Sequence, residues 1–360
     1  MIAILIFILI LSLLIIVHEF GHFIAARKNG VRVEQFSLGF GPLIYKIKKG
    51  DTEYKLNLIP LGGYVKMAGD NQLEYHGKSD EYFAKSPGKR FQIIFFGPLL
   101  NYVLGFLFFW LIFFVGYPSL TTKVGGLVDG YGAKAAGLQV ADKILSVDGH
   151  KVDLWEDLQL AVRDRKTKSS VRLEVLRNNQ ELKFDVPIKD KVLDDQLGEK
   201  RVLGIIGISP FDEIIEVKHG FFESVYLGLK KTVNLTSMTY IGLWRLVSGK
   251  MSMRDSMTGP LGIFFITSKA AKLGLIAVMH LIAVLSVSLA IFNLLPLPIL
   301  DGGHLFLLGL EKLRKKALGI KAEEVINNIG FSLMIALALF VTYNDVMRLY
   351  GDKISKMVTK

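Results

Sequence analysis

Residues 18–22 read H-E-F-G-H and close an apolar run that begins at Met1. A run of this length can cross a membrane as a helix. Residues four apart share one face of a helix, so His18 and His22 can bind one metal ion, and Glu19 lies one step round. Three such polar groups within a membrane helix are costly unless they are compensated. The stretch therefore predicts a metal centre at the end of the first membrane helix.

A second polar cluster supplies candidates for the remaining ligand. The chain has no cysteine, so histidines and carboxylates must hold any transition metal. A catalytic zinc ion takes three protein ligands and a water, and two histidines leave one place to fill. Asp301, just beyond an apolar run, is the best third ligand, and His304 is its rival. Asn293 could bind the substrate backbone or a developing oxyanion, or make an interhelical hydrogen bond.

Four apolar runs predict four membrane-spanning helices: residues 1–26, 93–116, 273–295 and 329–341. The loops after the first and third runs are rich in lysine and arginine, which predicts that both loops are cytoplasmic. The N-terminus, the segment 118–270 and the C-terminus then lie outside, although basic residues near the C-terminus conflict mildly with this. The first and third helices run parallel, so both polar clusters should meet near the cytoplasmic side.

The composition agrees with a membrane protein that carries polar domains. Hydrophobic residues make up 51% of the 360 residues, the mean hydropathy is +0.39 and the net charge is +11. We attribute the excess positive charge to positive-inside loops. Nucleic-acid binding is the alternative, but the sequence contains no helix-turn-helix, zinc finger or aromatic-basic platform that would favour it.

Several further motifs occur in the order typical of one family. The chain resembles the site-2 protease family of intramembrane zinc metalloproteases, peptidase family M50, and within it the bacterial RseP/RasP type. Besides residues 18–22, the segments that carry the resemblance are Gly39–Pro42, Pro60–Met67, Gly97–Asn101, Gly259–Ile263, and Asn293, Pro296, Asp301 and Gly302.

The resemblance implies a zinc metalloendopeptidase that performs regulated intramembrane proteolysis in the bacterial inner membrane. His18, His22 and Asp301 would bind Zn²⁺, and Glu19 would act as the general base. The implied substrates are transmembrane segments of single-span proteins, of the anti-sigma factor or signal-peptide remnant type. Cleavage would take place inside the membrane, near the cytoplasmic face.

The predicted fold class is an α-helical membrane protein with four transmembrane helices, a membrane-associated β-hairpin and one extracytoplasmic PDZ domain of α+β type. The predicted regions are 1–117, with two membrane helices and the hairpin; 118–215, the PDZ domain; 216–272, an amphipathic helical region; and 273–360, the last two membrane helices. The segment Ala135–Gly149 resembles a PDZ core, except that Ala141 stands where the family usually has glycine. The domain would either bind a peptide end or filter substrate ectodomains by size.

The predicted hairpin has strands at Tyr54–Ile59 and Tyr64–Met67, which flank a turn at Pro60–Gly63. At the cytoplasmic entrance its edge could hold an unwound substrate by strand addition. A purely structural hairpin is the alternative.

Two other functions would leave different marks in the sequence. A membrane-anchored PDZ receptor with an inactive metal site predicts an altered ligand or base, which the sequence does not have. A transporter predicts internal repeats and further broken helices, and neither is found.

Overall fold

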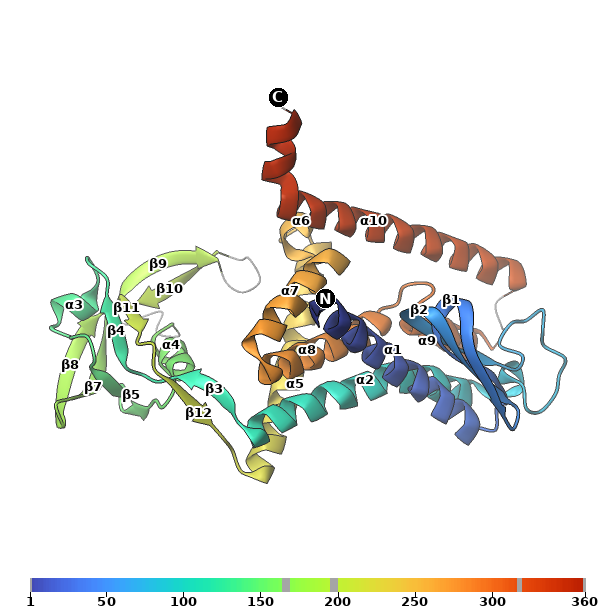
Figure 1. Ribbon diagram of the computed structural model, residues 1–360, viewed down its shortest axis with the longest axis horizontal. Helices are drawn as coiled ribbons and strands as arrows, with labels where there is room; N and C mark the ends of the chain where they lie inside the picture. The colour runs from blue at the N-terminus through green and yellow to red at the C-terminus, as the bar shows by residue number, and fades with distance from the viewer. Residues whose placement is uncertain (1, 164–168, 195–199, 316–318, 359–360) are drawn as a thin grey trace. The chain divides into compact units, whose positions relative to one another are not determined.

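A computed structural model describes residues 2–163, 169–194, 200–315 and 319–358. The chain forms two compact units. The helical unit contains residues 1–112, 222–243 and 253–360, and the sheet-rich unit contains residues 113–221 and 244–252. Each is described by itself below (Figure 1).

Four helices of the described chain are long and apolar enough to span a membrane. They are α1 (Ile2–Lys28), α2 (Pro87–Val115), α8 (Leu275–Asn293) and the part Glu324–Leu349 of α10 (Ile320–Val358). The fourth is longer than the apolar run predicted it to be, because the helix continues through the polar residues on both sides of that run. The remaining helices are α5 (Phe221–Val247), α6 (Met253–Ser256), α7 (Pro260–Leu273), α9 (Asp301–Arg314) and the 3-10 turn Tyr82–Ala84.

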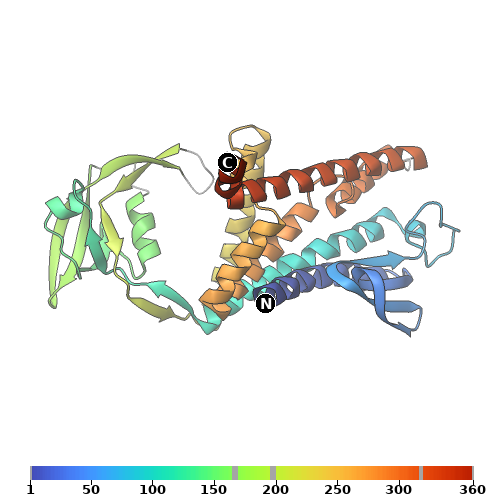
Figure 2. The ribbon, with the colours of Figure 1, turned by 45° about the horizontal axis from the view of Figure 1, so that its top comes forward.

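The spanning helices pack through small residues and apolar side chains. Ile10 and Leu14 of α1 join Leu281 and Ile282 of α8 in one buried cluster, and α1, α2 and α8 run alongside one another (Figure 2). A Cβ atom on Gly21 of α1 would lie 2.2 Å from the backbone oxygen of Phe96 in α2. Glycine at this position therefore lets the two helices approach closely, as is common in membrane helix pairs.

The N-terminus of α7 is capped from another helix. Asp345 of α10 is fully buried and accepts hydrogen bonds from the backbone N–H groups of Gly259 and Gly262, at 3.1 and 2.8 Å. The carboxylate satisfies donors that a helix start leaves unpaired. This contact connects α10 to the Gly259–Ile263 motif.

Strands β1 (Val33–Lys49) and β2 (Thr52–Met67) form a curled antiparallel sheet beside α1. Ser37 pairs with both Lys55 and Tyr64, so the first part of β1 lies between two segments of β2. The far part of this sheet exposes apolar side chains next to lysines: Leu43, Ile44, Tyr45, Ile47 and Leu58 are each at least half exposed. An exposed apolar patch with basic neighbours suits a membrane surface. The predicted hairpin is wrong in its strands: Tyr54–Ile59 and Tyr64–Met67 both lie within β2, and the turn that joins β1 to β2 is at residues 50–51 instead of Pro60–Gly63. The membrane association stays a prediction.

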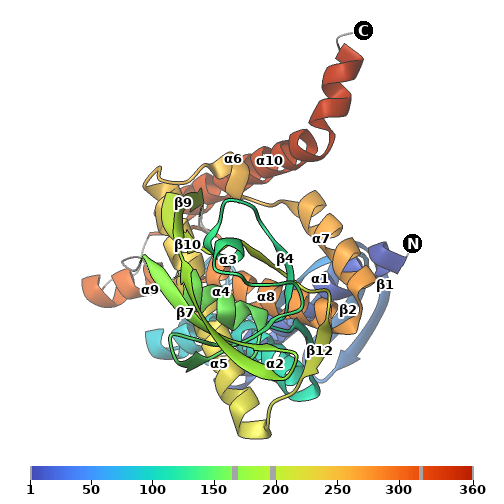
Figure 3. The same ribbon diagram turned by 90° about the vertical axis from the view of Figure 1, so that its left-hand side faces the viewer.

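The sheet-rich unit has one core of its own, formed by a four-stranded sheet in the order β6-β5-β7-β8 and helix α4 (Trp155–Arg163). This unit faces the viewer in Figure 3. Its other elements are β3 (Tyr117–Leu120), β4 (Val124–Leu127), α3 (Gly132–Ala135), β5 (Lys143–Val147), β6 (His150–Lys151), β7 (Ser170–Arg177), β8 (Gln180–Pro187), β9 (Lys189–Asp194), β10 (Lys200–Ile205), β11 (Ile208–Pro210) and β12 (Ile214–Val217).

Two turns of this unit use left-handed backbone. Asn178 and Asn179 have φ of 50° and 64° and join β7 to β8. Ala141 has φ of 74°, a conformation that favours glycine. The departure from the family's glycine at this position therefore leaves the turn in the conformation that a glycine would adopt.

Candidate metal centre

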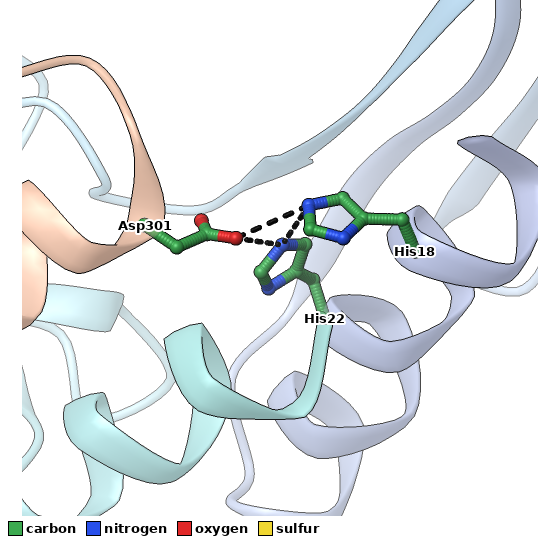
Figure 4. A group of neighbouring side chains, drawn as sticks. All are labelled: His18, His22 and Asp301. Carbon is green, nitrogen blue, oxygen red and sulfur yellow. Dashed lines mark hydrogen bonds and ion pairs between the residues drawn. The ribbon is translucent and has the colours of Figure 1, made fainter. Parts of the chain in front are cut away.

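The two histidines of the H-E-F-G-H stretch lie on one face of α1 and point toward the same place (Figure 4). Both side chains are buried, and their Nε2 atoms are 3.3 Å apart. The spacing of four residues on a helix brings the two rings together in this way.

Asp301 reaches the same place from the first position of α9. Its Oδ2 atom lies 3.1 Å from Nε2 of His18 and 3.5 Å from Nε2 of His22. Close backbone packing after α8 positions this carboxylate: a Cβ atom on Gly302 or Gly303 would lie 2.3 or 2.1 Å from backbone atoms of the segment that follows α8. Two glycines are therefore required for the tight turn that delivers Asp301.

These three side chains fit a metal ion. Their ligand atoms all lie within 4.8 Å of one another, and they form the only such group of three among the described residues. The Oδ2 atom of Asp301 is buried and receives no hydrogen bond of good geometry. Two neutral imidazoles and one carboxylate are the protein ligands of many catalytic zinc sites, which keep a fourth position open.

The surroundings of Asp301 also favour the charged form that a metal ligand needs. Burial by itself would raise the pKa of this carboxyl group, but His22 and His18, where they carry a proton, hold it below its ordinary range. This direction favours the ionised carboxylate, the form that a metal ligand has to take.

Helix α2 orients the His22 ring through a backbone hydrogen bond. The Nδ1 atom of His22 lies 2.9 Å from the backbone oxygen of Ile93, which can only accept a hydrogen bond. Nδ1 therefore carries a proton, so in the neutral ring Nε2 is the nitrogen that can bind a metal, the arrangement that metal-binding histidines usually have. Gly97, one turn further along α2, makes room for the ring, because a Cβ atom there would lie 2.3 Å from Nε2.

This contact leads to a first prediction. Gly97→Ala should displace the His22 ring and lower the affinity for zinc by about tenfold or more, in the range that the loss of a supporting contact costs. Zinc affinity is measured by competition with a chelator. Gly88→Ala, in the same helix but with no atom within 4 Å of the added Cβ, is the matched control and should bind zinc like the wild type. Equal affinities for the two variants would contradict the prediction.

Glu19 lies between the histidines and the β1–β2 sheet. Its carboxylate accepts a hydrogen bond from the backbone of Val65, and its side chain packs against Gly63. It lines the same cavity as His18 and His22, so it can reach a water molecule held near them. Its role as a general base stays a prediction.

A cavity of about 830 Å³ opens beside these groups. Both polar and apolar side chains line it. Its lining includes Tyr64, Val65 and Met67 of β2, Asp70, Gln72, Tyr75, Tyr82 and Phe83 of the segment after β2, Arg90 and Ile94 of α2, and Ile299, Leu300, His304, Leu307, Leu308 and Glu311 near or in α9.

The other predicted residues also lie here. Asn293 at the end of α8 lines the cavity, and its Nδ2 atom is 3.4 Å from Nε2 of His18. His304 lines the cavity but is not part of the group of three possible ligands. Among the described residues Asp301, and not its rival His304, belongs to the group that could hold a metal ion.

Two contacts of the site were not predicted. Arg90 of α2 is buried and forms an ion pair with Glu311 of α9, which ties the helix that carries Asp301 to the helix behind the histidines. Asn101 of α2 contacts His18. A charge and an amide next to an apolar run are signals that the sequence does offer, but it does not show which partner each one meets.

Comparison with known proteins finds similar chains. The model of peptidase family M50 matches residues 6–337. A protein of Agrobacterium fabrum that carries a zinc metalloprotease name is 34% identical over 362 residues, which cover 96% of each chain. "Zinc metalloprotease RasP" of Bacillus licheniformis is 29% identical over 96% of this chain and 98% of its own, and "Regulator of sigma E protease" of Haemophilus influenzae is 28% identical over 95% and 98%.

The chain is also similar to a solved structure, the PDZ domain of the SdrC-like protein from Listeria monocytogenes. The two are 20% identical, and the match covers 25% of this chain and 86% of the domain, with a TM-score of 0.21.

Proposed function

Since this chain belongs to peptidase family M50 and is a zinc metalloprotease, we propose that it cleaves peptide bonds inside the membrane, in the transmembrane segments of single-span proteins. The observation that carries the proposal is the position of the three ligands and Glu19. His18 and Glu19 belong to a helix that can span a membrane, and both polar and apolar side chains line the cavity beside them. Water and an apolar substrate can therefore meet there.

Each residue of the site has a chemical task. His18, His22 and Asp301 would hold Zn²⁺, which when bound supplies Lewis acidity and lowers the pKa of a bound water. Glu19 takes the proton from the attacking water and passes it to the nitrogen of the leaving amine. The Asn293 side-chain amide donates a hydrogen bond to the substrate carbonyl oxygen, where negative charge develops.

The β1–β2 sheet would hold the substrate next to these groups. A helix must unwind before its peptide bonds become accessible, and its backbone groups then need new partners. Tyr64, Val65 and Met67 lie in the outer segment of β2 and line the cavity. Strand addition to this segment would satisfy the unwound backbone. A single cysteine at Val65 should therefore crosslink to a cysteine in the substrate span, and failure to crosslink would argue for a purely structural sheet.

The names of two relatives point to a class of substrates. "Regulator of sigma E protease" and "Regulator of sigma-W protease RasP" are named for the regulation of sigma factors. For this chain we propose single-span anti-sigma factors, or the membrane remnants of signal peptides, as substrates. The sheet-rich unit would be a PDZ domain that binds or filters their ectodomains.

The proposal is tested with purified full-length protein in detergent or vesicles. A single-span model protein should be cut within its apolar segment, as mass spectrometry of the products would show, and a zinc chelator should stop the reaction. A water-soluble peptide with the same sequence around the cut, but without the apolar segment, should be cut far more slowly. Cleavage of both at equal rates would contradict an intramembrane specificity.

The orientation in the bacterial inner membrane is part of the proposal. We place the N-terminus, the sheet-rich unit and the C-terminus outside, and the active site near the cytoplasmic side. Because the chain has no cysteine, single cysteines report the side directly. A maleimide that cannot cross membranes should label Glu181→Cys in intact cells, and Asp51→Cys only after lysis, since both positions are exposed. The opposite pattern would invert the orientation.

A further inference from the structure

His18 needs a partner for its second ring nitrogen if it is to bind a metal through Nε2. A neutral imidazole carries one proton, and the nitrogen that binds the metal must be the bare one. For His22 the backbone oxygen of Ile93 fixes the proton on Nδ1. For His18 the hydrogen-bond partner of Nδ1 among the described residues is the side chain of Asn101, with 3.4 Å between Nδ2 and Nδ1.

Asn101 is buried where α2 packs against α1 and α8. It is fully buried in α2, four residues after Gly97, so the glycine faces His22 and the asparagine faces His18 one turn away. Ser286 of α8 donates a hydrogen bond of 2.8 Å to the backbone oxygen of Asn101, which fixes the backbone at this residue. The side chain can still rotate, and rotation exchanges its oxygen for its nitrogen.

The two orientations of the amide have opposite consequences for His18. With Nδ2 toward the ring, Nδ1 must accept and Nε2 must carry the proton, so Nε2 cannot bind a metal. With Oδ1 toward the ring, Nδ1–H donates to it and Nε2 is bare. The Oδ1 atom is buried and has no hydrogen-bond partner in its present orientation, and which amide atom faces the ring is decided by the hydrogen bonds it makes.

We propose that Asn101 is a positioning residue of the metal centre: its Oδ1 accepts a hydrogen bond from Nδ1–H of His18 and thereby makes Nε2 the metal-binding nitrogen. The inference rests on the proposed metal centre. It gives a reason for the G-P-x-x-N pattern in α2, in which glycine makes room for one histidine and asparagine selects the tautomer of the other.

The test compares zinc affinities of full-length variants by competition with a chelator of known affinity. Asn101→Leu removes the acceptor at similar volume and should weaken zinc binding about 10- to 100-fold. Asn101→Asp keeps an oxygen acceptor and should bind zinc within about threefold of the wild type. A role in packing alone predicts the reverse order, because a buried carboxylate is costlier than a leucine.

Thr267→Val is the matched control, since it also replaces a buried polar side chain in a helix of the same unit, away from the metal centre. It should bind zinc like the wild type. Wild-type affinity in Asn101→Leu, or equal losses in Asn101→Leu and Asn101→Asp, would overturn the inference and leave the metal centre standing. If the leucine variant does not fold, Asn101→Ala takes its place. A wild-type chain that binds no zinc would overturn the metal centre itself, and this inference with it.

Discussion

Glu19→Gln should abolish cleavage of a single-span substrate while zinc binding and folding stay close to those of the wild type. The substitution keeps the size of the side chain and removes the proton acceptor, and the loss of a general base lowers kcat by about 10²- to 10⁴-fold. Glu19 is not one of the three grouped ligand residues, so the zinc content should not change. The measurements are product formation, zinc content and the circular dichroism of the purified variant.

Glu34→Gln is the control for this experiment. Glu34 belongs to β1, close in sequence to Glu19, but it pairs with Arg32 and does not line the cavity. Its variant should cleave like the wild type. If the Glu19→Gln variant cleaves the substrate at the wild-type rate, another group accepts the proton.

Asp301→Ala should lose both zinc and activity. The variant keeps two histidines, and two ligands hold zinc much more weakly than three. We expect the zinc affinity to fall by more than the roughly 10- to 100-fold that the loss of a supporting contact costs. Chelator competition measures the affinity, and the cleavage assay should lose its signal in parallel.

His304→Ala separates the two candidate ligands. His304 lies three residues further along α9 and lines the same cavity, so its loss changes the neighbourhood without removing a proposed ligand. Its zinc content should stay at the wild-type level. Unchanged zinc in Asp301→Ala together with a loss in His304→Ala would make His304 the third ligand.

The sequence predicted the parts of the site that follow from the helical repeat and from the number of membrane-spanning helices between two segments. The spacing of His18 and His22 puts both rings on one helix face whatever surrounds the helix. The number of spans between the two polar clusters puts Asp301 on the same side of the membrane as the histidines. In the structure these three side chains do lie together, although their role as zinc ligands stays a proposal until zinc is measured.

The sequence could not predict contacts that depend on how two helices meet. The backbone oxygen of Ile93 and the amide of Asn101 contact the histidines because Gly21 and Gly97 let α1 and α2 approach to a particular depth. No local pattern encodes that depth. The cavity wall formed by residues 70–83 was not predicted either, because irregular segments leave no periodic signal.

The ion pair between Arg90 and Glu311 has a consequence for assembly. It joins α2, made early in synthesis, to α9, made late, and the proposed zinc site joins the same two ends of the chain through His18 and Asp301. An ion that binds only the completed arrangement stabilises it by mass action. Zinc would then act as a folding ligand as well as a catalyst, and a newly made polypeptide could become a working hydrolase only after the segment that carries Asp301 had docked.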